Sequence, residues 1–138
     1  MKRIIATLFF ASSLNAVADT LTLQITDVRT DAGKLMVAIL GSAAAYDDKV
    51  APSASVILPA RIGTVTYTTD ALPAGEYAIR VMHDENDNGK LDANFVGIPK
   101  EPYGFSNNAR GRMGPPKWEA ARFSLGADGA TQTIQLNH

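Results

Sequence analysis

The stretch TLTLQITDV, residues 20–28, carries the clearest structural pattern in the chain. Apolar Leu21, Leu23 and Ile25 alternate with polar residues, a period of two that is typical of a strand with one face in a core. After a turn at 31–33 (DAG), residues 34–40 (KLMVAIL) are apolar on both faces. That pattern predicts a central strand covered on two sides. The domain is therefore expected to begin with two β-strands.

Further short β-rich segments follow along the chain, divided by Pro and Gly. Residues 41–55 are predicted either as a loop or as one helical turn. With six to eight short strands and no long helix, we expect a single antiparallel β-sandwich, Greek-key and prealbumin/Ig-like, of about seven strands with one long ordered loop. The later predicted strands are 55–58, 62–69, 76–83, 120–125 and 130–136.

The first eighteen residues have the layout of a secretory signal peptide. A positive start at residues 1–3 (MKR) precedes an apolar run at 4–14 and a small-residue cleavage site at 16–18 (AVA). We therefore assign 1–18 as a signal peptide and 19–138 as the β-sandwich domain, exported to the periplasm or the extracellular space. No transmembrane segment is expected, because no apolar run approaches about 20 residues.

Composition excludes several classes of chemistry. The chain has 138 residues, no cysteine and two histidines, His83 and His138. Disulfides, thiolate nucleophiles and zinc cages of several Cys or His are therefore excluded. The net charge is −1, and removing Lys2 and Arg3 from the 13 basic residues leaves 11 against 14 acidic ones, a net charge of −3. No nucleic-acid partner is expected from this balance.

Residues 84–116 form a segment of 33 residues that is rich in Asn, Gly and Pro and has no sustained period. Loops longer than about 12–15 residues are uncommon in compact domains and are usually functional or disordered. The segment contains several aromatic and aliphatic residues, which a disordered tail would not carry. We therefore expect one long ordered loop that holds the functional residues.

The start of this loop, DENDNGKLD at 84–92, has the oxygen spacing of an EF-hand calcium loop. Oxygen-bearing side chains recur at offsets 1, 3, 5 and 9, and Gly89 stands at offset 6, where the sharp bend is needed. Calcium takes six to eight oxygen ligands, which such a loop can turn inward. The predicted calcium ligands are Asp84, Asn86, Asn88, Lys90 through its carbonyl, and Asp92.

The loop departs from an EF-hand in two ways. Offset 12 is Phe95 instead of a bidentate Glu, and the incoming segment is a predicted strand instead of a helix. A distant carboxylate such as Glu101 could complete the shell. The alternative interpretation is a metal-free Asn/Asp/Gly turn whose side chains cap their own backbone.

The run DENDNGKLDANFVGIPKEPYGFSNNARG at 84–111, with the preceding LPAGEYA at 72–78, resembles an uncharacterised family of exported bacterial proteins catalogued as a domain of unknown function. The resemblance implies a β-sandwich similar to transthyretin-like and carboxypeptidase-regulatory-like domains, and it implies no known activity. The family normally has Asn-Gly-Asn-Gly where this chain has NDNG at 86–89. That departure adds an outward-facing carboxylate and leaves the predicted ligands in place.

His83 shares a strand face with Tyr77, Ile79 and Val81, so it is predicted to point toward the core. A buried, hydrogen-bonded histidine is one interpretation. The other is a metal-assisted hydrolase that acts through His83 and the carboxylates of 84–92, which would need a deep pocket and a reachable nucleophile. No Gly-x-Ser-x-Gly motif supports a serine hydrolase.

The stretch 102–110 (PYGFSNNAR) combines aromatic rings, amides and a guanidinium, which suits a sugar or peptide ligand. The alternative is that Phe105 anchors the loop while Ser106 and the asparagines satisfy buried backbone groups. The five basic and two acidic residues from 100 to 122 are predicted to compensate the acidic loop. The candidate ligand surface is His83, Tyr103, Phe105, Ser106, Asn107, Asn108 and Arg110.

These features together predict an exported, calcium-stabilised binding module without catalytic activity. Its partner is expected to be an unidentified protein or carbohydrate, and its oligomeric state stays open. Two alternatives remain: the metal-assisted hydrolase described above, and a metal-free structural or adhesion module.

Overall fold

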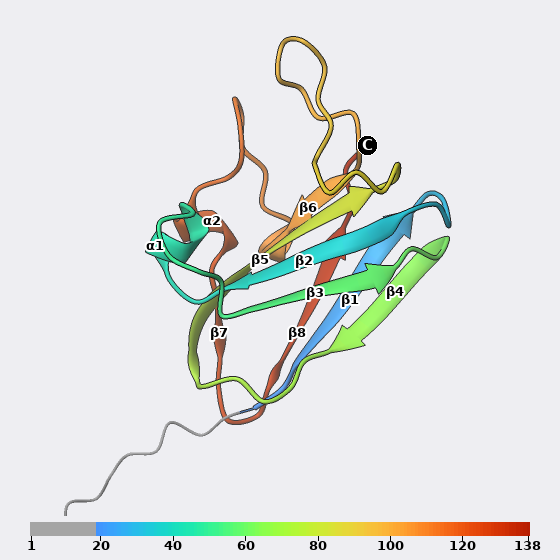
Figure 1. Ribbon diagram of the computed structural model, residues 1–138. Helices are drawn as coiled ribbons and strands as arrows, with labels where there is room; N and C mark the ends of the chain where they lie inside the picture. Colours follow the sequence, from blue (N-terminus) through green and yellow to red (C-terminus); the bar gives the residue numbers. More distant parts are fainter. Residues whose placement is uncertain (1–18) are drawn as a thin grey trace, which may run out of the picture.

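The computed structural model describes residues 19–138, and the predicted signal peptide at 1–18 lies outside the described residues. Two sheets pack face to face, as Figure 1 shows, so the predicted all-β sandwich is confirmed. Residues 19–138 contain eight strands, against about seven expected. Each sheet is described below from its strands.

The smaller sheet has the order β4-β1-β8. Its strands are β1 (Leu21–Val28), β4 (Gly63–Thr68) and β8 (Ala130–Gln135). β1 is antiparallel to β4 but parallel to β8, with Leu21 opposite Ala130. The prediction of an antiparallel fold misses this parallel pair. The chain reaches β8 from the other sheet, and a connection between sheets does not impose the antiparallel direction that a hairpin does.

The larger sheet has the order β3-β2-β5-β6, and β7 pairs with another part of β5. β5 (Gly75–Asp84) is the longest strand, and β2 (Lys34–Leu40) lies between it and β3 (Ala54–Pro59). The predicted central position of 34–40 is therefore confirmed. Two short strands, β6 (Tyr103–Phe105) and β7 (Phe123–Leu125), pair with the second and the first half of β5.

The main core lies between the two sheets and is built from alternate residues of the strands. β1 contributes Leu21, Leu23 and Ile25, each fully buried, as the period of two in TLTLQITDV predicts. From the other side, β2 and β5 contribute their inward residues. These are Leu35, Val37, Ile39, Tyr77, Ile79 and Val81.

A second apolar cluster covers the outer face of the larger sheet. Leu40 and Ala78 from the sheet pack there against Tyr46, Phe105 and Ala121. Two single helical turns contribute to this cluster, α1 (Ala43–Tyr46) and α2 (Trp118–Ala121). A third turn, η1 (Ser106–Asn108), directly follows β6. The helical turn allowed for in 41–55 is thus present. Within residues 19–138, these helices are far too short to span a bilayer, and no other helix there qualifies.

The segment 84–116 is not one loop, because β6 and η1 divide it. Residues 85–102 connect β5 to β6, and 109–117 connect η1 to α2. Both connections rise on the β6 side of the larger sheet in Figure 1, in yellow-orange and orange-brown. The prediction of a single 33-residue loop is wrong here, because three residues paired to β5 give too short a pattern to be seen in the sequence.

Candidate functional site

The predicted calcium loop begins at the last residue of β5. Asp84 is fully buried there, and its carboxylate accepts hydrogen bonds from the backbone N–H of Asn88 (3.1 Å) and of Gly89 (2.7 Å). Gly89 has a φ of +78°, a left-handed conformation that glycine adopts without strain. The loop therefore closes around the Asp84 carboxylate, as the spacing of oxygen-bearing residues suggests.

Three other predicted ligands meet at one point on the open side of the loop. The Nδ2 of Asn86 donates to Asp92 Oδ2 (2.5 Å), and the Nδ2 of Asn88 donates to both oxygens of Asp92 (2.9 and 3.1 Å). The amide donors of Asn88 and Asn86 lower the pKa of the Asp92 carboxyl, because they stabilise its charged form. This cluster of side chains faces solvent, since Asn86 and Asn88 are exposed.

Glu101, considered above as a distant ligand, lies at the base of the loop. Its side chain is buried, and its two oxygens accept hydrogen bonds from the backbone N–H of Glu85 (2.6 Å) and of Asp92 (2.9 Å). One carboxylate therefore holds both ends of the segment 85–92 together. No pattern in the sequence places Glu101 there, since it is 16 residues from Glu85.

The turn between β1 and β2 packs against the loop 84–92, a contact that the sequence did not predict. Gly33 approaches so closely that a Cβ on it would lie 1.9 Å from the carbonyl oxygen of Asp84. On one side Arg29 forms a two-pronged ion pair with Glu85 (2.9 and 2.5 Å). On the other, Lys34 Nζ lies 2.7 Å from Asp87 and 3.9 Å from Asp84.

These contacts correct the predicted source of compensating charge. The cations that pair with the acidic loop are Arg29 and Lys34, whereas Arg122 from the basic segment pairs with Glu76. The ion pair lowers the pKa of Glu85 and raises that of Arg29. The hydrogen bond to Asp87 raises the pKa of Lys34. Because β2 pairs with β5 in register, the turn that precedes β2 is placed beside the loop that follows β5.

The loop contains the features of both interpretations of its sequence. Asn86 Oδ1 accepts from the N–H of Asn88 (3.3 Å), and Asn88 Oδ1 accepts from that of Lys90 (3.0 Å), as a self-capping turn requires. Within residues 19–138, no three His, Asp or Glu side chains cluster as metal ligands. An ion here would therefore need amide and carbonyl oxygens besides carboxylates, a mixture that calcium accepts.

His83 lies in the core beneath the loop, as predicted. It is fully buried, and its Nε2 is 2.8 Å from the carbonyl oxygen of Ala32. Because a carbonyl only accepts, Nε2 carries the proton, and Nδ1 has no hydrogen-bond partner among the described residues. Neither of the two pockets described below includes His83. Its burial and its hydrogen bond agree with the interpretation of His83 as a buried, hydrogen-bonded histidine.

The candidate ligand surface is divided by the structure. Phe105 and Ser106 are buried like His83, Tyr103 is half-buried, and Asn107, Asn108 and Arg110 are exposed. Ser106 Oγ accepts from the N–H of Ile79 (2.9 Å) and donates to the carbonyl of Ala121 (2.5 Å). Ser106 thus satisfies buried backbone groups, as the alternative interpretation predicts.

The neighbouring asparagines bind backbone as well, although they are exposed. Asn107 Nδ2 donates to the carbonyls of Ala120 (3.1 Å) and Arg122 (2.8 Å), and Asn108 Oδ1 accepts from the N–H of Gln135 (2.9 Å). Both asparagines have a positive φ, which Asn tolerates better than most residues. Residues 106–108 therefore connect β5, β8 and α2, and we call them the Ser-Asn-Asn clamp.

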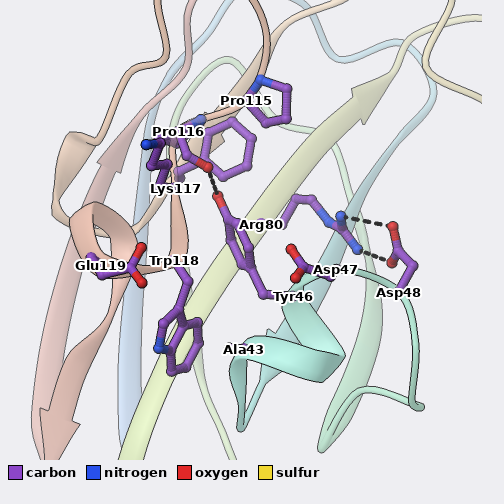
Figure 2. A pocket seen from close by; sticks show the side chains of 11 residues that line it. Ala43, Tyr46, Asp47, Asp48, Arg80, Pro115, Pro116, Lys117, Trp118 and Glu119 are labelled. Carbon is purple, nitrogen blue, oxygen red and sulfur yellow. Dashed lines mark hydrogen bonds and ion pairs between the residues drawn. The ribbon is translucent and has the colours of Figure 1, made fainter.

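A pocket of about 530 Å³ lies on the outer face of the larger sheet (Figure 2). Tyr46 donates from its hydroxyl to the carbonyl of Pro116 (2.7 Å), and burial raises its pKa. Arg80 of β5 points to Asp48, with Nη2 2.7 Å from Oδ1. A second, smaller pocket lies beside Ile39, Tyr67 and Leu72. The polar side chains that line the larger pocket are mostly charged: Asp47, Asp48, Arg80, Lys117 and Glu119.

Together the two sheets and the polar loop define a β-sandwich domain with its candidate site at the end of one strand. The chain belongs to the family described as uncharacterized proteins conserved in bacteria (DUF2141), which matches residues 23–135. No curated protein and no solved structure matches the chain. The likeness to transthyretin-like domains expected from the sequence stays a prediction.

Proposed function

We propose that this protein is an exported binding module whose loop 84–92 is stabilised by calcium. The observation that carries the proposal is the meeting of Asn86, Asn88 and Asp92 at one point on the loop's open side. Their spacing of 3, 5 and 9 is the one that places side-chain oxygens around calcium. Asp84, and Lys90 through its carbonyl, are the remaining proposed ligands, with Glu101 holding the loop closed.

The amide groups of the two asparagines explain how the loop is stable with and without an ion. Without an ion, their N–H groups provide the positive partners of the Asp92 carboxylate. When the side-chain amide of an asparagine rotates by half a turn, its oxygen takes almost the position that its nitrogen had. After that rotation, the amide oxygens face the carboxylate of Asp92 and repel it. Binding of a cation between these oxygens is then favourable, because it removes the repulsion.

This exchange predicts weak binding. Turning the amides breaks their hydrogen bonds to Asp92 and those that their oxygens accept from the backbone. Each such bond contributes about 0.5–1.5 kcal/mol. Calcium coordination must offset that loss, so we expect a Kd in the range of about 10⁻⁴–10⁻³ M that extracellular modules use. Export, proposed from residues 1–18, would place the loop where calcium reaches such concentrations.

The test is the thermal midpoint of residues 19–138 in chelator and across a calcium titration, with magnesium as control. A ligand at 100 times its Kd stabilises the native state by about 2.7 kcal/mol. In a domain of this size that corresponds to a rise of several degrees. We expect this rise with calcium and a smaller one with magnesium, which prefers fewer protein ligands and keeps its waters.

Two Asp→Asn variants, one inside the loop and one outside it, make the test specific. Asp92→Asn removes a proposed ligand charge from a partly exposed position and should abolish the calcium-dependent rise. Asp128→Asn changes an exposed carboxylate in the turn between β7 and β8 and should leave the rise unchanged. A parent protein with no calcium-dependent shift, or an equal shift in Asp92→Asn, would show that the loop is only a self-capping turn.

A further inference from the structure

Residues 93–99 form a small hairpin at the tip of the β5–β6 connection. Ala93 and Pro99 form an isolated bridge, and the N–H of Asn94 donates to the carbonyl of Ile98 (2.8 Å). Inside the turn, Asn94 Oδ1 accepts from the N–H of both Val96 and Ile98 (3.0 Å each). The tip is therefore held by its own hydrogen bonds and has a defined shape.

This ordered tip presents apolar side chains to solvent. Phe95 is 100% exposed, Val96 63% and Ile98 60%, although each would be expected in a core. Met113, on the second connection, is also fully exposed. Both connections extend in the same direction beyond the larger sheet in Figure 1. The exposed apolar side chains of the hairpin, Phe95, Val96 and Ile98, are close together in the chain, and such a group marks an interaction surface.

Basic side chains flank both tips. Lys90 and Lys100 stand on either side of the hairpin 93–99, and Arg110 and Arg112 precede Met113. All four are exposed, and none takes part in the ion pairs found within residues 19–138. Of the acidic side chains nearby, Asp87 is paired with Lys34 and Glu85 with Arg29, whereas Asp92 binds the amides of Asn86 and Asn88 and also interacts with the charge of Lys100. Basic side chains therefore flank both apolar tips, and those beside Met113 have no ion-pair partner within residues 19–138.

We infer that this end of the molecule docks on a lipid bilayer that carries anionic headgroups. The tips project outward from the larger sheet in Figure 1, so their exposed side chains can sink into a soft apolar layer. Lysine and arginine beside them match the phosphate charge of the surface. The inference deepens the proposed function by naming the partner of the binding module. It rests on that module and not on calcium, because the hairpin is shaped by hydrogen bonds within residues 93–99.

The experiment measures co-sedimentation of residues 19–138, which contain every described strand, with vesicles of phosphatidylcholine alone or with phosphatidylglycerol. It is run in chelator, so that failure of calcium binding does not affect it. We expect binding to the anionic vesicles and little to the neutral ones. Phe95→Ser with Val96→Ser should weaken binding more than tenfold, and Lys100→Gln about fivefold.

The matched control is Val50→Ser, an equally apolar side chain that is 53% exposed in the segment between α1 and β3. It should bind vesicles like the parent. In a Phe95→Trp variant, brominated lipid should quench the new tryptophan, which distinguishes insertion from attachment by charge alone. No binding to anionic vesicles, or binding that is unaffected by Phe95→Ser with Val96→Ser, would overturn the inference. A dimer that depends on Phe95 and forms without vesicle binding would overturn it as well.

Discussion

Two asparagine-rich segments follow β5, and they use the same side chains in opposite ways. In the loop 84–92, Asn86 and Asn88 bind Asp92 and the loop's own backbone. In the Ser-Asn-Asn clamp, Asn107 and Asn108 bind the backbone of α2 and β8, far away in the sequence. Asparagine is suited to both, since its amide carries a donor and an acceptor. The two segments differ in how far away their partners lie in the chain. The asparagines of the clamp bind distant segments, whereas those of the loop bind their own neighbours, which is why we propose a cation site only in the loop.

The largest effect that this comparison predicts is in the clamp. Ser106→Ala would leave the N–H of Ile79 and the carbonyl of Ala121 without their partner in a buried place. We expect a loss of about 2 kcal/mol in the free energy of unfolding, measured with urea. Calcium binding at the loop should not change. The control is Ser124→Ala, at an exposed position of β7. A urea midpoint of Ser106→Ala equal to that of the parent would contradict the structural role of the clamp.

A smaller and more local effect is expected at the base of the loop. Glu101→Gln replaces one carboxylate oxygen by an amide nitrogen, which cannot accept a hydrogen bond from the backbone. Because charge-assisted hydrogen bonds are lost, we expect destabilisation of about 1 kcal/mol. Amide hydrogen exchange should accelerate at Glu85 and Asp92 but not at Ile79. Equal acceleration at Ile79 would mean that the loop and the clamp open together.

The smallest effect concerns the ion pair beside the clamp, between Asp48 and Arg80. The hydrogen bond from Arg80 lowers the pKa of Asp48. A lowered pKa in the folded state means that the pair stabilises the protein above the unfolded value of about 3.9. That contribution is lost as pH falls through the lower folded value. Carboxyl NMR titration should show this, and Arg80→Met should return Asp48 to its ordinary range. The pair is exposed, so the thermal midpoint should barely move.

Much of the sandwich was predictable from local patterns. The alternation of Leu21, Leu23 and Ile25 predicted their burial, and the two apolar faces of 34–40 predicted a central strand. Strand β6 was not predictable, since three residues give no measurable period. Nor was the parallel pairing of β1 with β8, because two segments more than a hundred residues apart carry no local sign of their relative direction.

The candidate site was likewise predictable only in part from the sequence. The spacing of Asp84, Asn86, Asn88 and Asp92 predicted a polar loop whose side chains converge, since neighbours along a tight turn must meet. It did not predict the support from Arg29, Lys34 and Gly33, which depends on the register between β2 and β5. The stretch 103–110 was equally compatible with a ligand surface and with structural anchoring.

By itself, the sequence determined the all-β class, the core faces of the long strands and the oxygen-bearing loop, because each depends on residues close together in the chain. Only the tertiary structure decided that Ser106, Asn107 and Asn108 hold strands together. It also decided that Glu101 closes the loop and that Phe95 is left in solvent. Partners and burial at these positions come from segments far apart in the chain, and folding alone brings those segments into contact.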